Sequence, residues 1–234
     1  MKNKEQDLMP QVPVNTGETH IACTLLLDTS GSMEGKPIEE LNKGLQEFGK
    51  ALQEDDLALG RAEINIITFD SEVHEQLRFT PAISYEAPTL EAGGLTSLNH
   101  AINRGLDNIQ ERTELYKSQG IPYYRSWLFV LTDGAATDTE LESSTRARLQ
   151  EAIRQKHVVF MPMGIGEYAD VEMLKSYYPR EMAQKFVLKA DANNFKEAFA
   201  WLGNSIGKVT KADLVKDDKV QLAPVPNDVF EVSI

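Results

Sequence analysis

The stretch Leu25–Gly35, LLLDTSGSMEG, decides how the rest of this sequence is interpreted. Its three leucines continue an apolar run that begins at His20, and an unbroken apolar run bounded by a turn signal is typical of a strand buried on both faces. The run ends at a carboxylate, Asp28, and hydroxyl side chains follow. In doubly wound sheets, ligands bind beyond the carboxyl ends of the strands. We therefore expect Asp28 to lie at a binding site.

Beyond this stretch, strand-like and helix-like segments alternate along the chain. In segment 36–55 the apolar residues recur at spacings of three and four, which indicates one face of a helix. Strands are expected at 20–28, 61–70, 125–134, 158–166 and 185–190, and helices at 36–55, 97–120, 139–157, 170–179 and 194–209. Segment 72–80 alternates and suits an antiparallel edge strand. This order predicts a three-layer α/β/α, Rossmann-like sandwich with a mostly parallel sheet and one antiparallel edge strand.

The length and composition favour one globular domain. The chain has 234 residues, of which 41% are apolar and 26% charged. We expect an N-terminal arm at 1–18, a domain at 19–209 and a tail at 210–234. The tail carries the apolar stretch DVFEVSI, which leaves three alternatives open: an added edge strand, a docked segment or a loose end.

The charge and the cysteine count exclude several classes of function. The net charge is −12, from 24 basic and 36 acidic residues, and a chain with this balance repels nucleic acid and anionic membranes. No apolar run approaches the length of a membrane span, and the first residues lack the apolar core of a signal peptide. The single cysteine, Cys23, cannot form an internal disulfide and is expected in the core. We therefore expect a cytoplasmic protein with no nucleic-acid or membrane partner.

Three segments place oxygen-bearing side chains at the predicted strand ends. DTSGS supplies Asp28, Ser30 and Ser32, GGLTSL supplies Thr96, and LTDG supplies Asp133. Neither sulfur nor imidazole belongs to this set, and oxygen ligands suit Mg²⁺, Mn²⁺ or Ca²⁺ rather than Zn²⁺. Alternate residues after the strand can converge on one cation as the chain turns, and nearby glycines allow the backbone to approach closely.

These three motifs, in this order, resemble the metal-ion-dependent adhesion site of von Willebrand factor A domains, and the resemblance covers about residues 20–208. The stretches PIEELNKGLQEF, INIITFDSEV and GGLTSLNHAI are similar to the bacterial tellurium-resistance TerY type. Some members of that type carry a cysteine-rich extension, which this chain lacks. The resemblance implies that the hydroxyls of Ser30, Ser32 and Thr96 bind the ion, and that Asp28 and Asp133 bind it directly or through water. It also implies a protein partner whose Asp or Glu carboxylate completes the coordination, in a stress-response or signalling complex with a kinase or phosphatase.

Two alternatives to this hypothesis stay open at the level of sequence. In the first, the same five residues only cap turns and helices. In the second, the chain is a metal-dependent phosphatase of the haloacid dehalogenase type, but that class needs a second acid where this chain has Ser30.

Other motifs indicate no catalysis. GSMEGK is one residue too short for a P-loop, and GIGEYA favours a simple strand-to-helix turn. The pair Asp55–Asp56 is expected in a solvated turn. No serine or cysteine has a recognisable base beside it, so we expect a binding protein rather than an enzyme.

Overall fold

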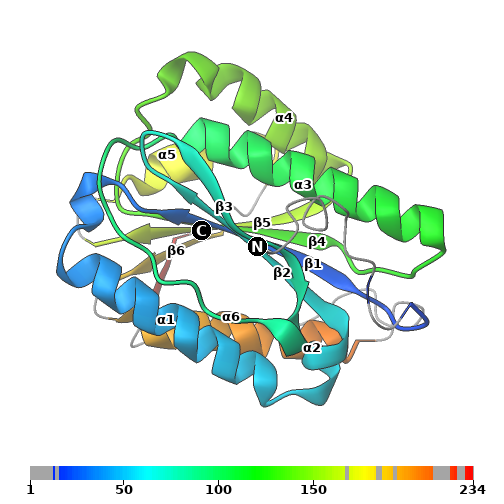
Figure 1. The fold of residues 1–234 in the computed structure, drawn as a ribbon. Helices are drawn as coiled ribbons and strands as arrows, with labels where there is room; N and C mark the ends of the chain where they lie inside the picture. Colours follow the sequence, from blue (N-terminus) through cyan, green and yellow to red (C-terminus); the bar gives the residue numbers. More distant parts are fainter. Residues whose placement is uncertain are drawn as a thin grey trace, which may run out of the picture.

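The computed structural model describes residue 13 and residues 16–166, 169–182, 186–191, 194–212, 222–225 and 230–233. Most of the predicted arm, most of the tail and residues 167–168 of GIGEYA lie outside these ranges. The described residues form three layers, with α1, α2 and α6 on one face of a central sheet and α3, α4 and α5 on the other (Figure 1).

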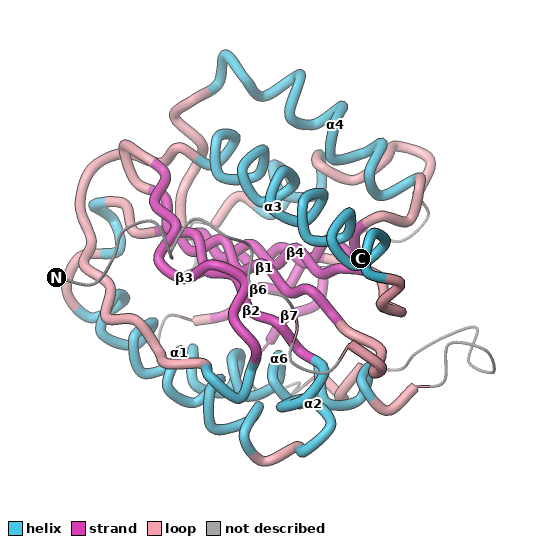
Figure 2. Tube along the Cα trace, turned by 45° about the vertical axis from the view of Figure 1, so that its right-hand side comes forward, coloured by secondary structure: helices cyan, strands magenta, loops and turns pink. Residues whose placement is uncertain are grey.

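The sheet has seven strands in the order β3-β2-β1-β4-β5-β6-β7. The strands are β1 (Ile21–Asp28), β2 (Ala62–Phe69), β3 (Val73–Pro81), β4 (Ser126–Thr132), β5 (Val158–Ile165), β6 (Val187–Ala190) and β7 (Phe230–Ser233). The helices are α1 (Lys36–Gln53), α2 (Asp56–Arg61), α3 (Leu98–Gln119), α4 (Glu142–Arg154), α5 (Val171–Ser176) and α6 (Phe195–Thr210). Figure 2, a view turned by 45°, shows the same arrangement, with helices on both faces of the sheet. The predicted three-layer fold is confirmed.

Both edges of the sheet are antiparallel. Strand β3 runs antiparallel to β2, as the alternating pattern at 72–80 predicts, and β7 runs antiparallel to β6. The expectation of a single antiparallel edge strand was therefore incomplete, because the apolar end of the tail adds a second one. Four residues of β7 pair with β6, from Val187 opposite Ser233 to Ala190 opposite Phe230.

Strand β1 is buried along its whole length because it supplies both cores. Leu25 and Leu27 pack with α1 and α6 on one face, whereas Leu26 packs with α3 on the other. Cys23 belongs to the first of these cores and is fully buried, as expected, and this burial raises the pKa of its thiol. The unbroken apolar run in the sequence is thus the signature of a central strand.

The sheet reverses its order between β1 and β4. From β1 the chain passes through α1 and α2 to β2 on one side, then returns through α3 to β4 on the other side. Parallel pairing sets Leu27 opposite Leu131, so the ends of the two strands lie next to each other. This reversal is the place where doubly wound sheets form their ligand crevice.

The expectation of a solvated turn at Asp55–Asp56 was wrong. Asp55 is the N-cap of α2, and its Oδ1 accepts hydrogen bonds of 3.1 Å from the backbone N–H groups of Leu57 and Ala58. Lys211, just past α6, lies 2.5 Å from Asp55 Oδ2. A helix of six residues is too short to show apolar periodicity, which is why the sequence did not reveal it.

In the part of the chain that the structure describes, no helix is both long and apolar enough to cross a bilayer.

A buried ion pair connects β2 to α3. Arg112 and Glu63 have side chains that are 3% and 1% exposed, and Arg112 Nε donates to Glu63 Oε2 over 2.9 Å. The Tyr116 hydroxyl also donates to this carboxylate, and the guanidinium lies 5.6 Å from the centre of the Phe79 ring. Removing one partner of such a pair leaves the other charge buried, without water and without an opposite charge.

We predict that Asp55→Ala lowers the free energy of unfolding by about 1 kcal/mol at neutral pH, because a helix N-cap and an ion pair are lost together. Partial burial raises the pKa of Asp55, but the Lys211 ion pair and the two backbone hydrogen bonds outweigh it and hold the pKa below its ordinary value of 3.8. A depressed pKa stabilises the fold above 3.8, and this contribution is lost as the pH falls through the folded-state pKa. Urea denaturation at neutral pH and below pH 3.8 measures this effect. The difference in unfolding free energy between Asp55→Ala and wild type should be smaller at the lower pH. Asp56→Ala, at the exposed neighbour, should change little, and an equal loss in both variants would contradict the capping role.

We predict that Arg112→Met costs about 3–5 kcal/mol of unfolding free energy, since the Glu63 carboxylate is left buried without its cation. The double variant Arg112→Met with Glu63→Gln should recover part of this loss. Arg148→Met breaks a half-exposed pair with Asp107 and should cost no more than about 1 kcal/mol. Chemical denaturation of the three variants measures these differences, and no recovery in the double variant would contradict the prediction.

Candidate functional site

The structure brings the five predicted site residues to one edge of the sheet. Asp28 is the last residue of β1, Ser30 follows it, and Ser32 lies in a short 3-10 helix at Gly31–Met33. Thr96 precedes α3, and Asp133 directly follows β4.

A chain of hydrogen bonds joins four of them. The backbone N–H of Ser30 donates to Asp28 Oδ1 over 2.8 Å. The hydroxyl oxygens of Ser30 and Ser32 lie 3.0 Å apart, and the Ser32 hydroxyl donates to Asp133 Oδ1 over 2.8 Å. Two carboxylates from strands far apart in sequence are thereby linked through two serines.

Thr96 reaches the same cluster from the glycine-rich loop. A Cβ atom on Gly134 would lie 3.8 Å from Thr96 Oγ1 and 4.0 Å from Ser32 Oγ. The space beside Gly134, next to Asp133, therefore lies near both hydroxyls. Thr96 therefore lies beside the part of the cluster formed by Ser32 and Asp133.

Backbone hydrogen bonds hold the DTSGS turn against the glycine-rich loop. The N–H of Gly31 donates to the carbonyl of Gly94 over 3.1 Å, and the N–H of Gly93 donates to the carbonyl of Thr29 over 2.8 Å. Gly94 has φ +79°, and a side chain there would also collide with Ser71. The loop needs glycine at this position for both reasons.

Sequence reasoning missed Thr132, the last residue of β4. Its hydroxyl donates to Asp28 Oδ2 over 2.5 Å, so both oxygens of the buried Asp28 carboxylate are occupied. The register of β1 and β4 places the two residues side by side, and this register cannot be deduced from the spacing of the motifs.

Two further residues after β4 position Thr96, and the sequence had not singled them out. Thr137 hydrogen bonds to both sides of Thr96: its hydroxyl accepts from the Thr96 N–H over 3.1 Å, and its own N–H donates to the Thr96 carbonyl over 2.9 Å. Asp138 accepts from the N–H groups of Asn99 and His100 at the start of α3. A carboxylate from another loop thus caps α3, a contact that leaves no local signal in the sequence.

The site is electrostatically unfavourable for a second negative charge. Burial raises the pKa of the Asp28 carboxyl above its ordinary value, and the nearby charge of Asp133 acts in the same direction. Hydrogen bonds from Ser30 and Thr132 oppose the rise. A bound cation would offset both the burial and the repulsion.

The capping alternative explains only part of this geometry. Asp28 does accept a local turn hydrogen bond from Ser30. By contrast, the bond from Ser32 to Asp133 spans 101 positions of sequence and closes no turn or helix. The start of α3 is capped by Asp138 rather than by Thr96. Local capping therefore does not account for Ser32, Thr96 or Asp133.

The donor chemistry fits a hard cation. Among the described residues, no group of three or more His, Cys, Asp or Glu side chains is arranged to hold a metal. An ion at this edge would depend on hydroxyl oxygens as well as the two carboxylates, a donor set that Mg²⁺, Mn²⁺ and Ca²⁺ accept.

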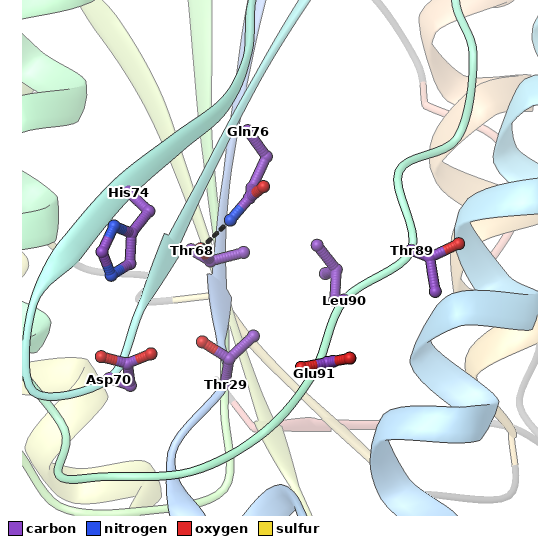
Figure 3. A pocket seen from close by; sticks show the side chains of 8 residues that line it. All are labelled: Thr29, Thr68, Asp70, His74, Gln76, Thr89, Leu90 and Glu91. Atoms are coloured by element: carbon purple, nitrogen blue, oxygen red, sulfur yellow. Dashed lines mark hydrogen bonds between the residues drawn. The ribbon is translucent and has the colours of Figure 1, made fainter.

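A polar cavity of about 240 Å³ adjoins the cluster (Figure 3). Thr29, which lies between Asp28 and Ser30, forms part of its lining. The other lining residues come from β2, β3 and the loops that follow them: Thr68, Asp70, His74, Gln76, Thr89, Leu90 and Glu91.

Known proteins share this fold and its sequence pattern. The profile of the von Willebrand factor type A domain family matches residues 23–201. A von Willebrand factor A domain-containing protein of Dictyostelium discoideum is 27% identical over 163 residues, and human inter-alpha-trypsin inhibitor heavy chain H3 is 28% identical over 155 residues. The matches cover 65% and 62% of this chain but only 16% and 15% of those proteins.

Two solved structures show the same fold at low sequence identity. The pilus adhesin SpaC of Lactobacillus rhamnosus GG, in an open conformation, superposes with a TM-score of 0.64 at 14% identity, covering 82% of this chain and 30% of that one. The ArnB paralog VWA2 of Sulfolobus acidocaldarius superposes with a TM-score of 0.55 at 16% identity, covering 81% and 46%. Taken with the sheet order and the match over most of its length, these similarities establish that the chain belongs to the von Willebrand factor type A domain family.

Proposed function

We propose that this domain binds a divalent cation at the Asp28–Asp133 cluster and uses it to hold a protein partner. The observation that carries the proposal is the convergence of Ser30, Ser32 and Asp133 through hydrogen bonds, with the Thr96 hydroxyl beside Gly134 on the same side as Ser32. Hydroxyl and carboxylate oxygens from three separate segments meet at the point where the strand order reverses.

The donor set suggests how a partner takes part. The hydroxyls of Ser30, Ser32 and Thr96 would bind the ion, while Asp28 and Asp133 would act directly or through water. Only two carboxylates belong to the cluster, so the ion remains attractive to an outside anion. A carboxylate from an Asp or Glu of the partner is the anion that this site would accept.

The proposal places the domain in the cytoplasm, in a stress-response or signalling complex that contains a kinase or phosphatase. This part rests on the similarity of INIITFDSEV and GGLTSLNHAI to the TerY type. Mg²⁺ is the expected ion, with Mn²⁺ or Ca²⁺ as substitutes, because Mg²⁺ is bound through few carboxylates and keeps several waters. An assay with a chromogenic phosphate ester tests the phosphatase alternative directly.

We predict that Mg²⁺ raises the melting temperature of the wild-type protein and has little effect on Asp28→Asn. At a concentration one hundred times Kd, the ion adds about 2.7 kcal/mol of stability, equivalent to about 5–10 °C for a domain of this size. Asn keeps the shape of Asp28 and can still accept the Ser30 hydrogen bond, which Ala would lose. Glu34→Gln, an exposed acid in the same loop, is the matched control and should respond like wild type. An equal response in Asp28→Asn would show that Asp28 is not a ligand.

We also predict that partner binding requires the ion. Protein immobilised in Mg²⁺ should retain a partner from extract of its source organism, EDTA should release it, and re-added Mg²⁺ should restore retention. Asp133→Asn should retain none, whereas Glu34→Gln should retain as much as wild type. Mass spectrometry of the released fraction identifies the partner and tests the kinase or phosphatase assignment. Retention that persists unchanged in EDTA would contradict metal dependence.

A further inference from the structure

The cavity beside the cluster is lined mostly by polar side chains, and two of them are acidic. Asp70 and Glu91 face it from opposite sides, and His74 also lines it (Figure 3). Among the described residues of its lining, none is a lysine or an arginine. In the hydrogen bonds and ion pairs of the described residues, neither carboxylate meets a cationic group; Asp70 Oδ1 accepts only the N–H of Glu72, over 2.9 Å. The cavity is therefore a place where negative charge lacks a cationic partner.

Hydrogen bonds give the cavity a fixed shape. On the sheet side, Gln76 Nε2 donates to Thr68 Oγ1 over 3.0 Å, so the carbonyl oxygen of Gln76 remains an acceptor. On the loop side, the Asn42 side chain of α1 donates to the Leu90 carbonyl over 2.9 Å and accepts from the Leu90 N–H over 2.8 Å. Walls held in this way cost little to order when a ligand enters.

Size and polarity decide which ligand fits. Pockets for small molecules typically enclose about 300–1,000 Å³ and are mostly apolar. This cavity, at about 240 Å³, is smaller, and Leu90 is the single apolar residue among the described residues that line it. It suits one long polar side chain better than a separate small molecule. With two carboxylates in the lining, a cationic side chain is the one whose charge complements the cavity.

We propose that the cavity receives a lysine or arginine side chain of the protein partner. This inference deepens the proposed function and rests on it for the identity of that partner. Thr29 lines the cavity and joins Asp28 to Ser30, so a partner segment that offers a carboxylate to the ion lies directly beside the cavity. The domain then recognises an acidic and a basic side chain that lie close together on its partner. The metal binds the acidic side chain, and Asp70 and Glu91 bind the basic one.

Three small probes test the cavity without the partner or the metal. They are the N-acetyl, N-methylamide derivatives of arginine, lysine and norleucine, titrated into the ¹⁵N-labelled full chain in EDTA. The arginine and lysine probes should shift the side-chain amide signals of Gln76 and the backbone signals of residues 89–91, in a saturable and salt-sensitive way. Norleucine, of similar length but uncharged, should not. Equal shifts with norleucine, or shifts confined to other residues, would overturn the proposal.

Charge-neutralising variants complete the test. Asp70→Asn with Glu91→Gln should weaken binding of the arginine probe at least about fivefold, because two ion pairs are lost. Glu91→Gln alone changes an exposed side chain and should not disturb the fold. This single variant therefore still tests the cavity if the double variant fails to fold. Glu86→Gln, exposed on the same loop but outside the lining, should bind like wild type. Unchanged affinity in the double variant would refute the cavity's role.

The two proposals fail separately. Because the probes are titrated in EDTA, their binding reports on the cavity alone, whereas the melting response to Mg²⁺ reports on the cluster alone. A normal Mg²⁺ response with no probe binding would overturn only the inference about the basic side chain.

Discussion

The parallel pairing of β1 with β4 is the constraint on which the candidate site depends. It sets the buried carboxylate of Asp28 beside Thr132, whose hydroxyl donates to one of its oxygens while the Ser30 N–H donates to the other. A carboxylate removed from water needs such partners, since an unsatisfied buried charge is costly. Once Asp28 is held in this way, the turn that follows must pass close to the end of β4, and Ser32 reaches Asp133.

A second polar layer fixes α3 over the sheet and, with it, the position of Thr96. Asn65 donates to the Leu77 carbonyl where the β2–β3 register is irregular, and its side-chain carbonyl accepts from Asn108 of α3. Glu63 and Arg112 form the buried ion pair farther along the same helix. Asp138 caps the helix at the end nearest the site. Polar contacts of this kind have preferred geometries, so they define the position of α3 more narrowly than apolar packing does.

The candidate metal cluster and the acidic cavity share one turn of backbone. Asp28 and Ser30 belong to the cluster, while the residue between them, Thr29, lines the cavity. Successive side chains on an extended backbone point to opposite sides, so one short segment can serve both. A partner bound at this edge would meet a cation and a pair of carboxylates side by side, an arrangement in which complementary charge contributes to specificity.

The sequence by itself determined the fold class and the five candidate ligands. Apolar runs and helical periodicity are local, and so is the signature of Asp28, Ser30 and Ser32 in one motif. Helix α2 was missed because six residues show no period, and the second antiparallel edge strand stayed one of three alternatives. Only the tertiary structure decided which residues support the site. Thr132, Thr137 and Asp138 act through contacts across strands and loops, and the lining of the cavity combines residues of two strands with residues of three loops. Strand register and loop contacts arise from packing of the whole chain, and no pattern within one segment encodes them.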